Sequence, residues 1–411
     1  MHVFLTSYGG AHVEAIIPLI KELEKRGIQY TYLALTIASV VAEKRGVKHL
    51  SISDFVSPSA PNIEKYGRML LSAHHNAGAG IRVEDSLAYL GSLLNDTAQI
   101  VGFDRAFTRY NEVGLNAFTP LNTAKRILSE VRPDWVVATA SPRMEAAILR
   151  AAVELGIPSL CMVDLFAILE LPWLKEPDHA HWLSAYSQKT KERLVNAGRD
   201  PSKIITIGYP AFDNLCDAQL DHKAQSWRSE KCLRNDDIVV LWAEQPEPAN
   251  PNLPRSIRNK LAKICAKNGW KFVVRLHPAS TDPLKEVIPD TAIASERDEP
   301  LATVAYASDT VVTMTSTVAM EMLLLDKPAI ILKGSQFDDM VDYSNDDGAL
   351  IAENIESVED CLHRIFYDIA TQQQLAKARK QLPKPGSTSR LTVDFLENKL
   401  KQTRKNILHS K

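Results

Sequence analysis

Three hydroxyl residues stand where a predicted strand ends and a helix begins, and a carboxylate follows one helical turn later. They are Thr315, Ser316 and Thr317, with Glu321 four residues on. Free backbone N–H groups at a helix N-terminus, together with hydroxyls, suit an anion such as a phosphate. A bound phosphate and a nearby carboxylate would suit the diphosphate and ribose hydroxyls of a nucleotide sugar. A capped helix with a solvated glutamate gives the same pattern.

Two other strand ends of the second half carry polar side chains. Arg275 and His277 close a buried strand, and Pro278 is expected to fix the turn that follows. A cationic or hydrogen-bonding pair of this kind suits phosphate oxygens. Glu244, Gln245 and Glu247 follow an earlier strand, where they are expected to meet sugar or base, or to form a proline-stiffened turn between domains.

The first half begins with a strand and a glycine turn. Gly9 and Gly10 let the backbone turn tightly and approach a ligand, and His12 and Glu14 follow at the start of a helix. A histidine there is well placed to act as general base on an acceptor hydroxyl. We therefore predict His12 as the base, with Glu14 or Asp164 as the second choice. The glycine spacing differs from G-x-G-x-x-G, so a dinucleotide-binding fingerprint is not predicted.

Two further loops of the first half are expected to contact substrate. Arg143 and Glu145 begin a helix, and Asp164 follows a buried strand. Acidic residues at helix N-termini are also favourable without any function, because they complement the helix dipole.

Short apolar strands alternate with helix-length segments along the whole chain, which is typical of doubly wound parallel sheets. The predicted strands are Val3–Thr6, Tyr30–Ala34, Trp135–Ala138, Ser159–Val163, Ile204–Ile207, Ile238–Trp242, Phe272–Leu276, Thr310–Thr313 and Ala329–Leu332. The predicted helices include Val13–Arg26, Thr119–Glu130 and Arg143–Leu155.

The length of 411 residues favours two domains. We predict an N-terminal Rossmann-like acceptor domain over residues 1–216, a linker over 217–236 and a Rossmann-like nucleotide-sugar domain over 237–385. A C-terminal helix would occupy 386–411. Two such halves imply an interdomain cleft at the carboxyl ends of both sheets, where ligands bind in this architecture.

Two segments depart from the regular alternation. Residues 57–118 form an insertion, helical in its second part, in which His74, His75 and the run Gly78–Gly80 are expected to form a mobile loop facing the cleft. The tail forms an amphipathic helix from Leu391 to Leu408. Its basic end is typical of a solvated helix face and compatible with contact at a membrane surface. The basic residues are Lys399, Lys401, Arg404 and Lys405.

Composition excludes several classes of protein. The net charge of −2 gives no reason to expect nucleic-acid binding. The five cysteines lack a CxxC pair, so we expect reduced thiols rather than disulfides or a zinc site. Apolar runs are strand-sized and the N-terminus does not resemble a secretion signal, which predicts a cytoplasmic protein. Asp338–Asp339 and Asp346–Asp347 lie in a polar segment rather than a cleft loop, so no metal site is predicted.

Taken together, the motifs resemble the GT-B superfamily of nucleotide-sugar enzymes. This superfamily contains bacterial surface-polysaccharide glycosyltransferases and, as structural relatives, the UDP-N-acetylglucosamine 2-epimerases. The resemblance covers most of the chain. Its anchors are Gly10-Ala-His-Val-Glu-Ala-Ile-Ile-Pro-Leu, Ile207-Gly-Tyr-Pro-Ala-Phe-Asp213, Arg275-Leu-His-Pro278, Thr315-Ser-Thr-Val-Ala-Met-Glu321 and Asp326-Lys-Pro328.

The resemblance implies that the donor nucleotide sits on the C-terminal domain and the acceptor on the N-terminal one. Ser316 and Thr317 match the phosphate-binding turn, Glu321 the ribose-binding glutamate, and His277 the histidine of the His-Pro motif. The epimerases usually carry a Gly-Thr-Arg-Pro-Glu type start, a second glutamate and a Ser-Gly-Gly turn. Here those places hold Gly-Ala-His-Val-Glu, Met320 and Thr-Ser-Thr, which favours a transferase.

The expected function is a metal-independent glycosyltransferase of surface polysaccharide biosynthesis. It would move a sugar from a nucleotide sugar to a glycan or lipid-linked acceptor without a cofactor. The acidic motif that usually accompanies His-Pro in sialyl-type transferases is missing, which leaves the donor open between UDP and CMP types. A 2-epimerase acting by elimination and re-addition, and a non-enzymatic regulatory protein on the same fold, are the alternatives. The sequence leaves the oligomeric state open.

Overall fold

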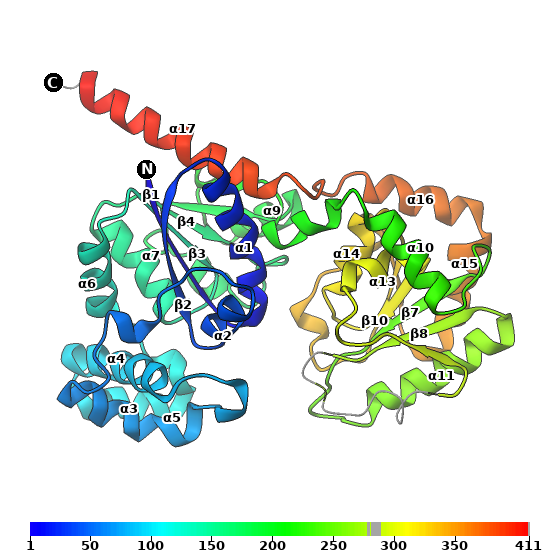
Figure 1. The fold of residues 1–411 in the computed structure, drawn as a ribbon, viewed down its shortest axis with the longest axis horizontal. Helices are drawn as coiled ribbons and strands as arrows, with labels where there is room; N and C mark the ends of the chain where they lie inside the picture. The colour runs from blue at the N-terminus through cyan, green and yellow to red at the C-terminus, as the bar shows by residue number, and fades with distance from the viewer. Residues whose placement is uncertain (278–279, 281–288, 410–411) are drawn as a thin grey trace. The chain divides into compact units, whose positions relative to one another are not determined.

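The chain folds into two compact units (Figure 1). The computed structural model describes residues 1–277, 280 and 289–409, so Pro278 of the predicted His-Pro turn lies outside the described residues. Unit 1 consists of Met1–Asp213 with Ser387–Lys411, and unit 2 consists of Asn214–Gly386. The predicted linker, residues 217–236, therefore belongs to unit 2, where it contains helix α10 (Leu220–Glu230). The C-terminal helix α17 (Thr388–His409) is part of unit 1.

Unit 1 is built on a six-stranded parallel sheet in the order β2-β1-β3-β4-β5-β6. Both faces of its central strands are buried, which is why they read as continuous apolar runs rather than alternating ones. The strands are β1 (His2–Tyr8), β2 (Gln29–Leu35), β3 (Trp135–Thr139), β4 (Ser159–Met162), β5 (Trp182–Ala185) and β6 (Ile204–Thr206).

Helices cover both faces of this sheet (Figure 1). One core joins Val3, Leu5 and Trp135 of the sheet to helices α1, α2 and α17. The other joins Phe4 and Val136 to helices α4, α6 and α7. The bounds of these helices are α1 (Gly10–Lys25), α2 (Ile37–Lys44), α4 (Val83–Val101), α6 (Leu121–Val131) and α7 (Met144–Glu154). Two short helices, α8 (Leu171–Leu174) and α9 (Gln188–Asn196), lie between later strands.

The insertion is more helical than predicted. It forms α3 (Pro61–His74), α4 and α5 (Phe103–Val113), and a Cβ at Gly67 would lie 2.6 Å from the Leu87 carbonyl oxygen. That glycine therefore permits close packing of α3 against α4. His74 belongs to α3 rather than to a loop, and both histidines have partners: His74 Nε2 lies 2.7 Å from the Tyr110 hydroxyl, and His75 Nδ1 lies 2.8 Å from the Ser86 hydroxyl.

Unit 2 repeats the architecture with the strand order β12-β11-β10-β7-β8-β9. Helices α11, α15 and α16 pack on one core of this sheet, and α10, α13 and α14 lie together away from that core (Figure 1). The strands are β7 (Val239–Ala243), β8 (Lys271–Arg275), β9 (Ala292–Ala294), β10 (Thr310–Thr313), β11 (Ala329–Leu332) and β12 (Ala349–Ala352). The helices are α11 (Leu253–Asn268), α13 (Leu301–Ala307), α14 (Val318–Leu324), α15 (Val358–Tyr367) and α16 (Ile369–Arg379).

The prediction of two Rossmann-like, doubly wound domains is confirmed. All nine predicted strands are present within two residues at each end. Within the described residues three strands were missed, β5, β9 and β12, each of three or four residues with at most one β-branched side chain. Each sheet has a topological switch point, where successive strands begin to be added on the other side. It lies between β1 and β3 in unit 1 and between β7 and β10 in unit 2. Ligands of such folds bind outside the carboxyl ends of these strands.

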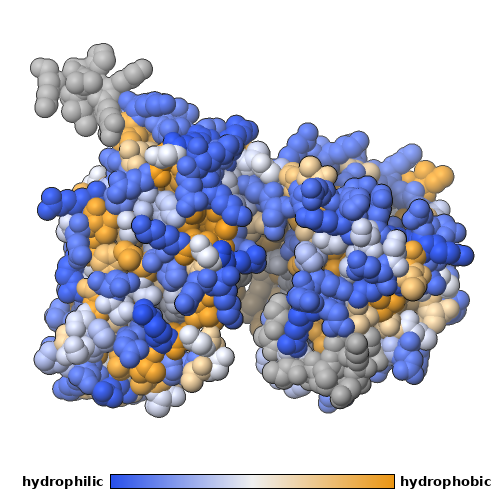
Figure 2. Space-filling view, in the orientation of Figure 1, coloured by the Kyte–Doolittle hydropathy of each residue, from blue (hydrophilic) through white to orange (hydrophobic). Residues whose placement is uncertain are grey.

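The surface drawn in Figure 2 is mostly hydrophilic, with scattered apolar patches over both units. Large exposed apolar side chains such as Ile100, Tyr367 and Ile369 are spread along the sequence, which is ordinary for a protein surface. In the part of the chain that the structure describes, every helix is too short or too polar to span a bilayer.

Candidate functional site

Four strand ends of unit 1 bring their polar side chains together. His12 lies in the first turn of α1 after β1, Thr139 ends β3, Asp164 follows β4 and Tyr209 follows β6. Because the strands are parallel, these positions share the carboxyl edge of the sheet. Two of the four residues, His12 after β1 and Thr139 at the end of β3, belong to the strands on either side of the switch point.

His12 is held at both ring nitrogens. Its Nε2 lies 3.2 Å from Asp164 Oδ2, while its Nδ1 lies 3.0 Å from Thr139 Oγ1 and 2.9 Å from Ser141 Oγ. The Tyr209 hydroxyl donates to the other oxygen of Asp164 at 3.3 Å. The Asp164 side chain is 31% exposed and that of His12 19% exposed, so the carboxylate is the more accessible of the two groups.

Glu145 contacts this cluster from the interior of the unit and is fully buried. The Thr139 hydroxyl donates to Glu145 Oε1, and Oε2 has no hydrogen-bond partner. Glu145 was predicted to contact substrate from the start of a helix. Its complete burial on α7 contradicts a direct contact and makes it a partner of the residues in the cluster.

The pKa values of three titratable groups in this cluster are raised. Burial disfavours the charged imidazole, but the hydrogen bond and charge of Asp164, with the charges of Glu145 and Glu170, raise the pKa of His12 to about 9. Burial, and then repulsion from Asp164, raises the pKa of Glu170 to about 7. Burial also raises the pKa of Glu145, with His12 opposing the shift. Glu170 was missed in the sequence because it follows the loop after β4 without any motif.

Arg143 adopts a backbone conformation that side chains rarely occupy, with φ of 70°. Its guanidinium lies over the Tyr8 ring, 4.7 Å from the centroid, and donates to the Tyr89 hydroxyl at 3.2 Å and to Asn116 Oδ1 at 3.1 Å. Arg143 therefore ties the end of β3 to the helical insertion. Contact between Arg143 and substrate stays a prediction.

The other predicted residues of this half lie around the glycine turn. Gly9 has φ of 84°, a conformation favoured by glycine, and immediately precedes Gly10, the first residue of α1. Glu14 does not join the His12 cluster: Arg45 donates to it at 2.8 Å, and both side chains are well exposed. This position does not favour Glu14 as the base.

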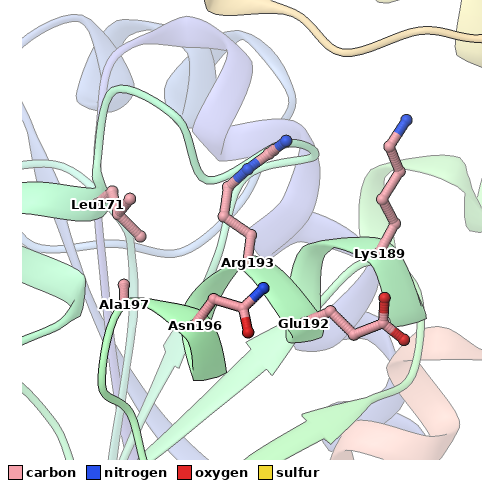
Figure 3. A pocket seen from close by; sticks show the side chains of 6 residues that line it. All are labelled: Leu171, Lys189, Glu192, Arg193, Asn196 and Ala197. Atoms are coloured by element: carbon pink, nitrogen blue, oxygen red, sulfur yellow. The ribbon is translucent and has the colours of Figure 1, made fainter.

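A pocket of about 440 Å³ adjoins the loop that carries Asp164 and Glu170 (Figure 3). Its volume is in the range of small-molecule sites. Arg193 donates to the Phe166 carbonyl in that loop. All of the polar side chains in Figure 3 come from α9, and apolar residues complete the wall. The lining residues are Leu171, Lys189, Glu192, Arg193, Asn196 and Ala197.

In unit 2, the side chain of Gln245, after β7, bonds the segment after β10, so it links the ends of the two strands at the switch point. Its Oε1 accepts from the backbone N–H of Thr315 at 2.7 Å and lies 3.0 Å from the Thr315 hydroxyl. Its Nε2 donates to Glu247 Oε1 at 2.7 Å, and Ser335 donates to the same oxygen at 2.5 Å. Gln245 thus fixes the turn before α14. Glu247 was predicted with Gln245 as a candidate contact for sugar or base, whereas Ser335 was not predicted and lies in no recognisable motif.

The predicted phosphate turn lies between β10 and α14. Ser316 is half-buried and its carbonyl accepts from the Tyr343 hydroxyl at 3.1 Å, whereas Thr317 is exposed. Glu321 lies in the first turn of α14. Burial lowers the pKa of Arg275, while the charges of Glu299, Glu321 and Asp298 oppose that shift. Glu321 and Arg275 thus share one electrostatic environment, but nucleotide binding by these residues stays a prediction.

Two predicted ligand residues have clear structural partners. Arg275 donates to Ser295 Oγ at 2.9 Å and to the Glu296 carbonyl at 3.1 Å. Glu244 forms an ion pair with the buried Arg258 at 2.9 Å. These contacts hold the loops after β9 and β7. Burial lowers the pKa of His277, which therefore favours the neutral ring.

Among residues 1–277, 280 and 289–409, no group of three or more histidine, cysteine, aspartate or glutamate side chains is arranged to hold a metal ion. Metal independence stays a prediction.

A family model for UDP-N-acetylglucosamine 2-epimerase matches residues 177–397, more than half of the chain. The chain belongs to this family. The predicted relationship to nucleotide-sugar enzymes of the GT-B superfamily is confirmed. No curated protein sequence is significantly similar to the chain.

Solved structures agree on the fold. The UDP-GlcNAc 2-epimerase from Neisseria meningitidis, bound to UDP-GlcNAc, matches with a TM-score of 0.62 at 13% identity, covering 97% of this chain and 100% of that one. MnaA from S. aureus with UDP matches at 0.58 and 13%, covering 98% and 97%. CalG4, the calicheamicin glycosyltransferase, matches at 0.57 and 14%, covering 96% and 98%. Epimerases and glycosyltransferases thus share this architecture.

Proposed function

We propose that the protein is a glycosyltransferase that moves a sugar from a UDP-sugar to a hydroxyl of a glycan or lipid-linked acceptor. The observation that carries this proposal is the pairing of Asp164 with His12 at the carboxyl edge of the unit 1 sheet. Transfer to a hydroxyl needs one accessible base near neutral pH. Asp164 meets that need because it is partly exposed and held from two sides, by His12 and Tyr209.

In the proposed reaction, Asp164 accepts the proton of the acceptor hydroxyl. The acceptor oxygen then bonds to the anomeric carbon of the donor, while the bond from that carbon to the diphosphate oxygen breaks and releases UDP. His12 was the first choice as base from the sequence. Both of its nitrogens lie within hydrogen-bonding distance of protein groups, and we therefore propose that it holds and stabilises Asp164.

We assign the acceptor to the pocket beside α9. Its amide, carboxylate and cationic side chains can hydrogen-bond the hydroxyls of a sugar, and it adjoins the loop that carries Asp164. Contact of the chain with a membrane surface would bring a lipid-linked acceptor closer, and surface polysaccharide synthesis would supply one.

We assign the donor to unit 2, with the diphosphate at Ser316 and Thr317, the ribose at Glu321 and the sugar phosphate near His277. Family membership, and the UDP-GlcNAc and UDP bound to two structural neighbours, support a UDP-type donor rather than a CMP-type one. Hydroxyls and backbone N–H groups would stabilise the leaving diphosphate, so no divalent metal is required in the proposed step.

A 2-epimerase is the second candidate. The family model favours it, and so does the presence of a second carboxyl group, Glu170, near Asp164, because elimination and re-addition need acid and base groups on both faces of the sugar. The missing epimerase motifs at the glycine turn and at Thr315–Thr317 weigh against it.

Product analysis with UDP-N-acetylglucosamine and related UDP-sugars, with and without glycan acceptors, tests the two candidates. We expect UDP to raise the melting temperature by mass action and an acceptor to be required for UDP release. Conversion of the free UDP-sugar to its 2-epimer without acceptor would establish the alternative. A melting temperature raised by CMP and not by UDP would overturn the donor class alone.

A further inference from the structure

One buried carboxylate is not used by the proposed reaction. Glu145 is fully buried, so it cannot touch a substrate, yet it connects to the reactive edge through a single hydroxyl. The contacts run from Glu145 Oε1 to Thr139 Oγ1, from there to His12 Nδ1, and from His12 Nε2 to Asp164 Oδ2. A buried carboxylate is costly, so its retention at this place calls for a role.

The positions of the protons follow from this chain of contacts. A hydroxyl has one proton, and a carboxylate can only accept. If Thr139 donates to Glu145, it offers only lone pairs to His12, so its contact with Nδ1 is a hydrogen bond when Nδ1 carries a proton. Nε2 must also carry a proton to bond the Asp164 carboxylate. With both nitrogens donating, His12 is an imidazolium.

Ser141 supports the same arrangement. Its hydroxyl oxygen lies 2.9 Å from His12 Nδ1. Like the Thr139 oxygen, it can offer a lone pair to a proton on Nδ1.

The charged surroundings balance the cation. His12 faces the charges of Asp164, Glu145 and Glu170. Glu145 in turn faces His12 and Asp164. Against the effect of burial, the charge of Glu145 also acts on Arg143, just before α7, and helps to raise the pKa of its guanidinium. Three carboxyl groups from three segments thus surround one imidazole.

We propose that Glu145 is a positioning residue that, through the Thr139 hydroxyl, keeps both ring nitrogens of His12 protonated and the ring aligned on Asp164. The role of Asp164 as base rests on the proposed function, whereas the protonation of His12 does not. As an imidazolium, His12 cannot accept a proton from the acceptor. It holds the Asp164 carboxylate in place by a charge-assisted hydrogen bond.

The titration of His12 in the full-length protein tests this directly, by NMR with ¹⁵N-labelled histidine and assignment through His12→Asn. In the wild type we expect one histidine to titrate near pH 9 with both nitrogens protonated below it. Glu145→Gln removes the charge at nearly constant volume and should lower that pKa by about one unit. An unchanged pKa in Glu145→Gln would show that Glu145 is itself protonated and would overturn the proposal.

Two matched variants guard against a change in folding. Glu14→Gln removes the same charge two residues from His12, but Glu14 pairs with Arg45, so the His12 pKa should not move. Thr139→Val removes the connecting hydroxyl and leaves Glu145 charged. It should change the ¹⁵N shift of Nδ1 even if Glu145→Gln does not fold, and an unaltered Nδ1 shift would contradict the proposal. Because no nucleotide sugar is needed, failure here is distinct from failure of the proposed function.

Discussion

The carboxyl edges of the two sheets have the same topology and different chemistry. In unit 1 the edge carries the titratable groups His12 and Asp164, with Glu145 buried nearby. In unit 2 the amide of Gln245 and the hydroxyl and N–H of Thr315 occupy the corresponding place beside the switch point. An amide and a hydroxyl stay uncharged at all ordinary pH values. This difference fits the proposed division of roles, in which the edge of unit 1 performs proton transfer and the edge of unit 2 binds the nucleotide.

The burial of acidic groups follows the same division. Glu145 leaves one carboxylate oxygen without a hydrogen bond. Glu247 of unit 2 is also buried, but Gln245, Ser335 and the backbone of Gln336 all donate to it. Glu247 is thus held as a structural anchor of its turn, whereas the charge of Glu145 is offset by fewer hydrogen bonds. The same fold thus supports different functions through the side chains that follow its strands.

The largest effect is expected at Asp164. Asp164→Asn keeps the size of the side chain and removes the base, so kcat should fall by roughly 10²–10⁴ while nucleotide affinity stays nearly constant. Steady-state kinetics and calorimetry measure the two quantities. Asp200→Asn, at an exposed turn of unit 1, is the control and should leave kcat unchanged. An active Asp164→Asn enzyme would remove the assignment of proton transfer to this residue.

The next effect concerns the pH dependence of stability in unit 1. The folded pKa of His12, about 9, exceeds its unfolded value near 6.5. The pair with Asp164 therefore stabilises the fold fully below about pH 6.5, and this contribution is lost as pH rises to about 9. Urea denaturation of wild type and His12→Asn should differ by on the order of 2–3 kcal/mol at pH 6 and much less at pH 9.5. A difference that does not change with pH would contradict the raised pKa.

A smaller effect is expected on the binding edge of unit 2. Glu321→Ala should weaken nucleotide binding by roughly 1–3 kcal/mol, because charge-assisted hydrogen bonds to the ribose are lost. Ser316→Ala should weaken it less, and neither change should alter the His12 titration. Calorimetry with UDP measures both. If neither variant loses affinity, the nucleotide does not bind at this turn.

The acceptor pocket should show a change in KM alone. Lys189→Met is expected to raise the acceptor KM by about tenfold, the effect of one lost hydrogen bond from a charged group, with the donor KM unchanged. Lys21→Met, at an exposed position on α1, provides the matched control. Equal acceptor KM values in the two variants would place the acceptor elsewhere.

No effect is expected from removal of divalent metals, because hydroxyls and N–H groups serve the leaving diphosphate. Turnover in EDTA should match turnover without it. Loss of activity in EDTA that Mg²⁺ or Mn²⁺ restores would contradict this prediction.

The sequence predicted both sheets because strands with two buried faces are apolar throughout and stand out from the helices around them. It missed β5, Trp182–Ala185, because four residues with a serine among them carry too little pattern. It identified His12 and Asp164 separately, since each follows a strand. It misjudged Glu145, whose place at a helix start gives no sign of the packing that buries it.

By itself, the sequence determined the alternation of strands and helices and the polar residues that follow the strands. Only the tertiary structure decided which of those residues meet, because the order of strands in a sheet depends on pairing between distant segments. His12 and Asp164 are 152 residues apart in the chain and come within hydrogen-bonding distance through the order β1-β3-β4. The protonation of His12 is likewise a property of the folded state, because it depends on burial and on carboxylates that only folding brings together.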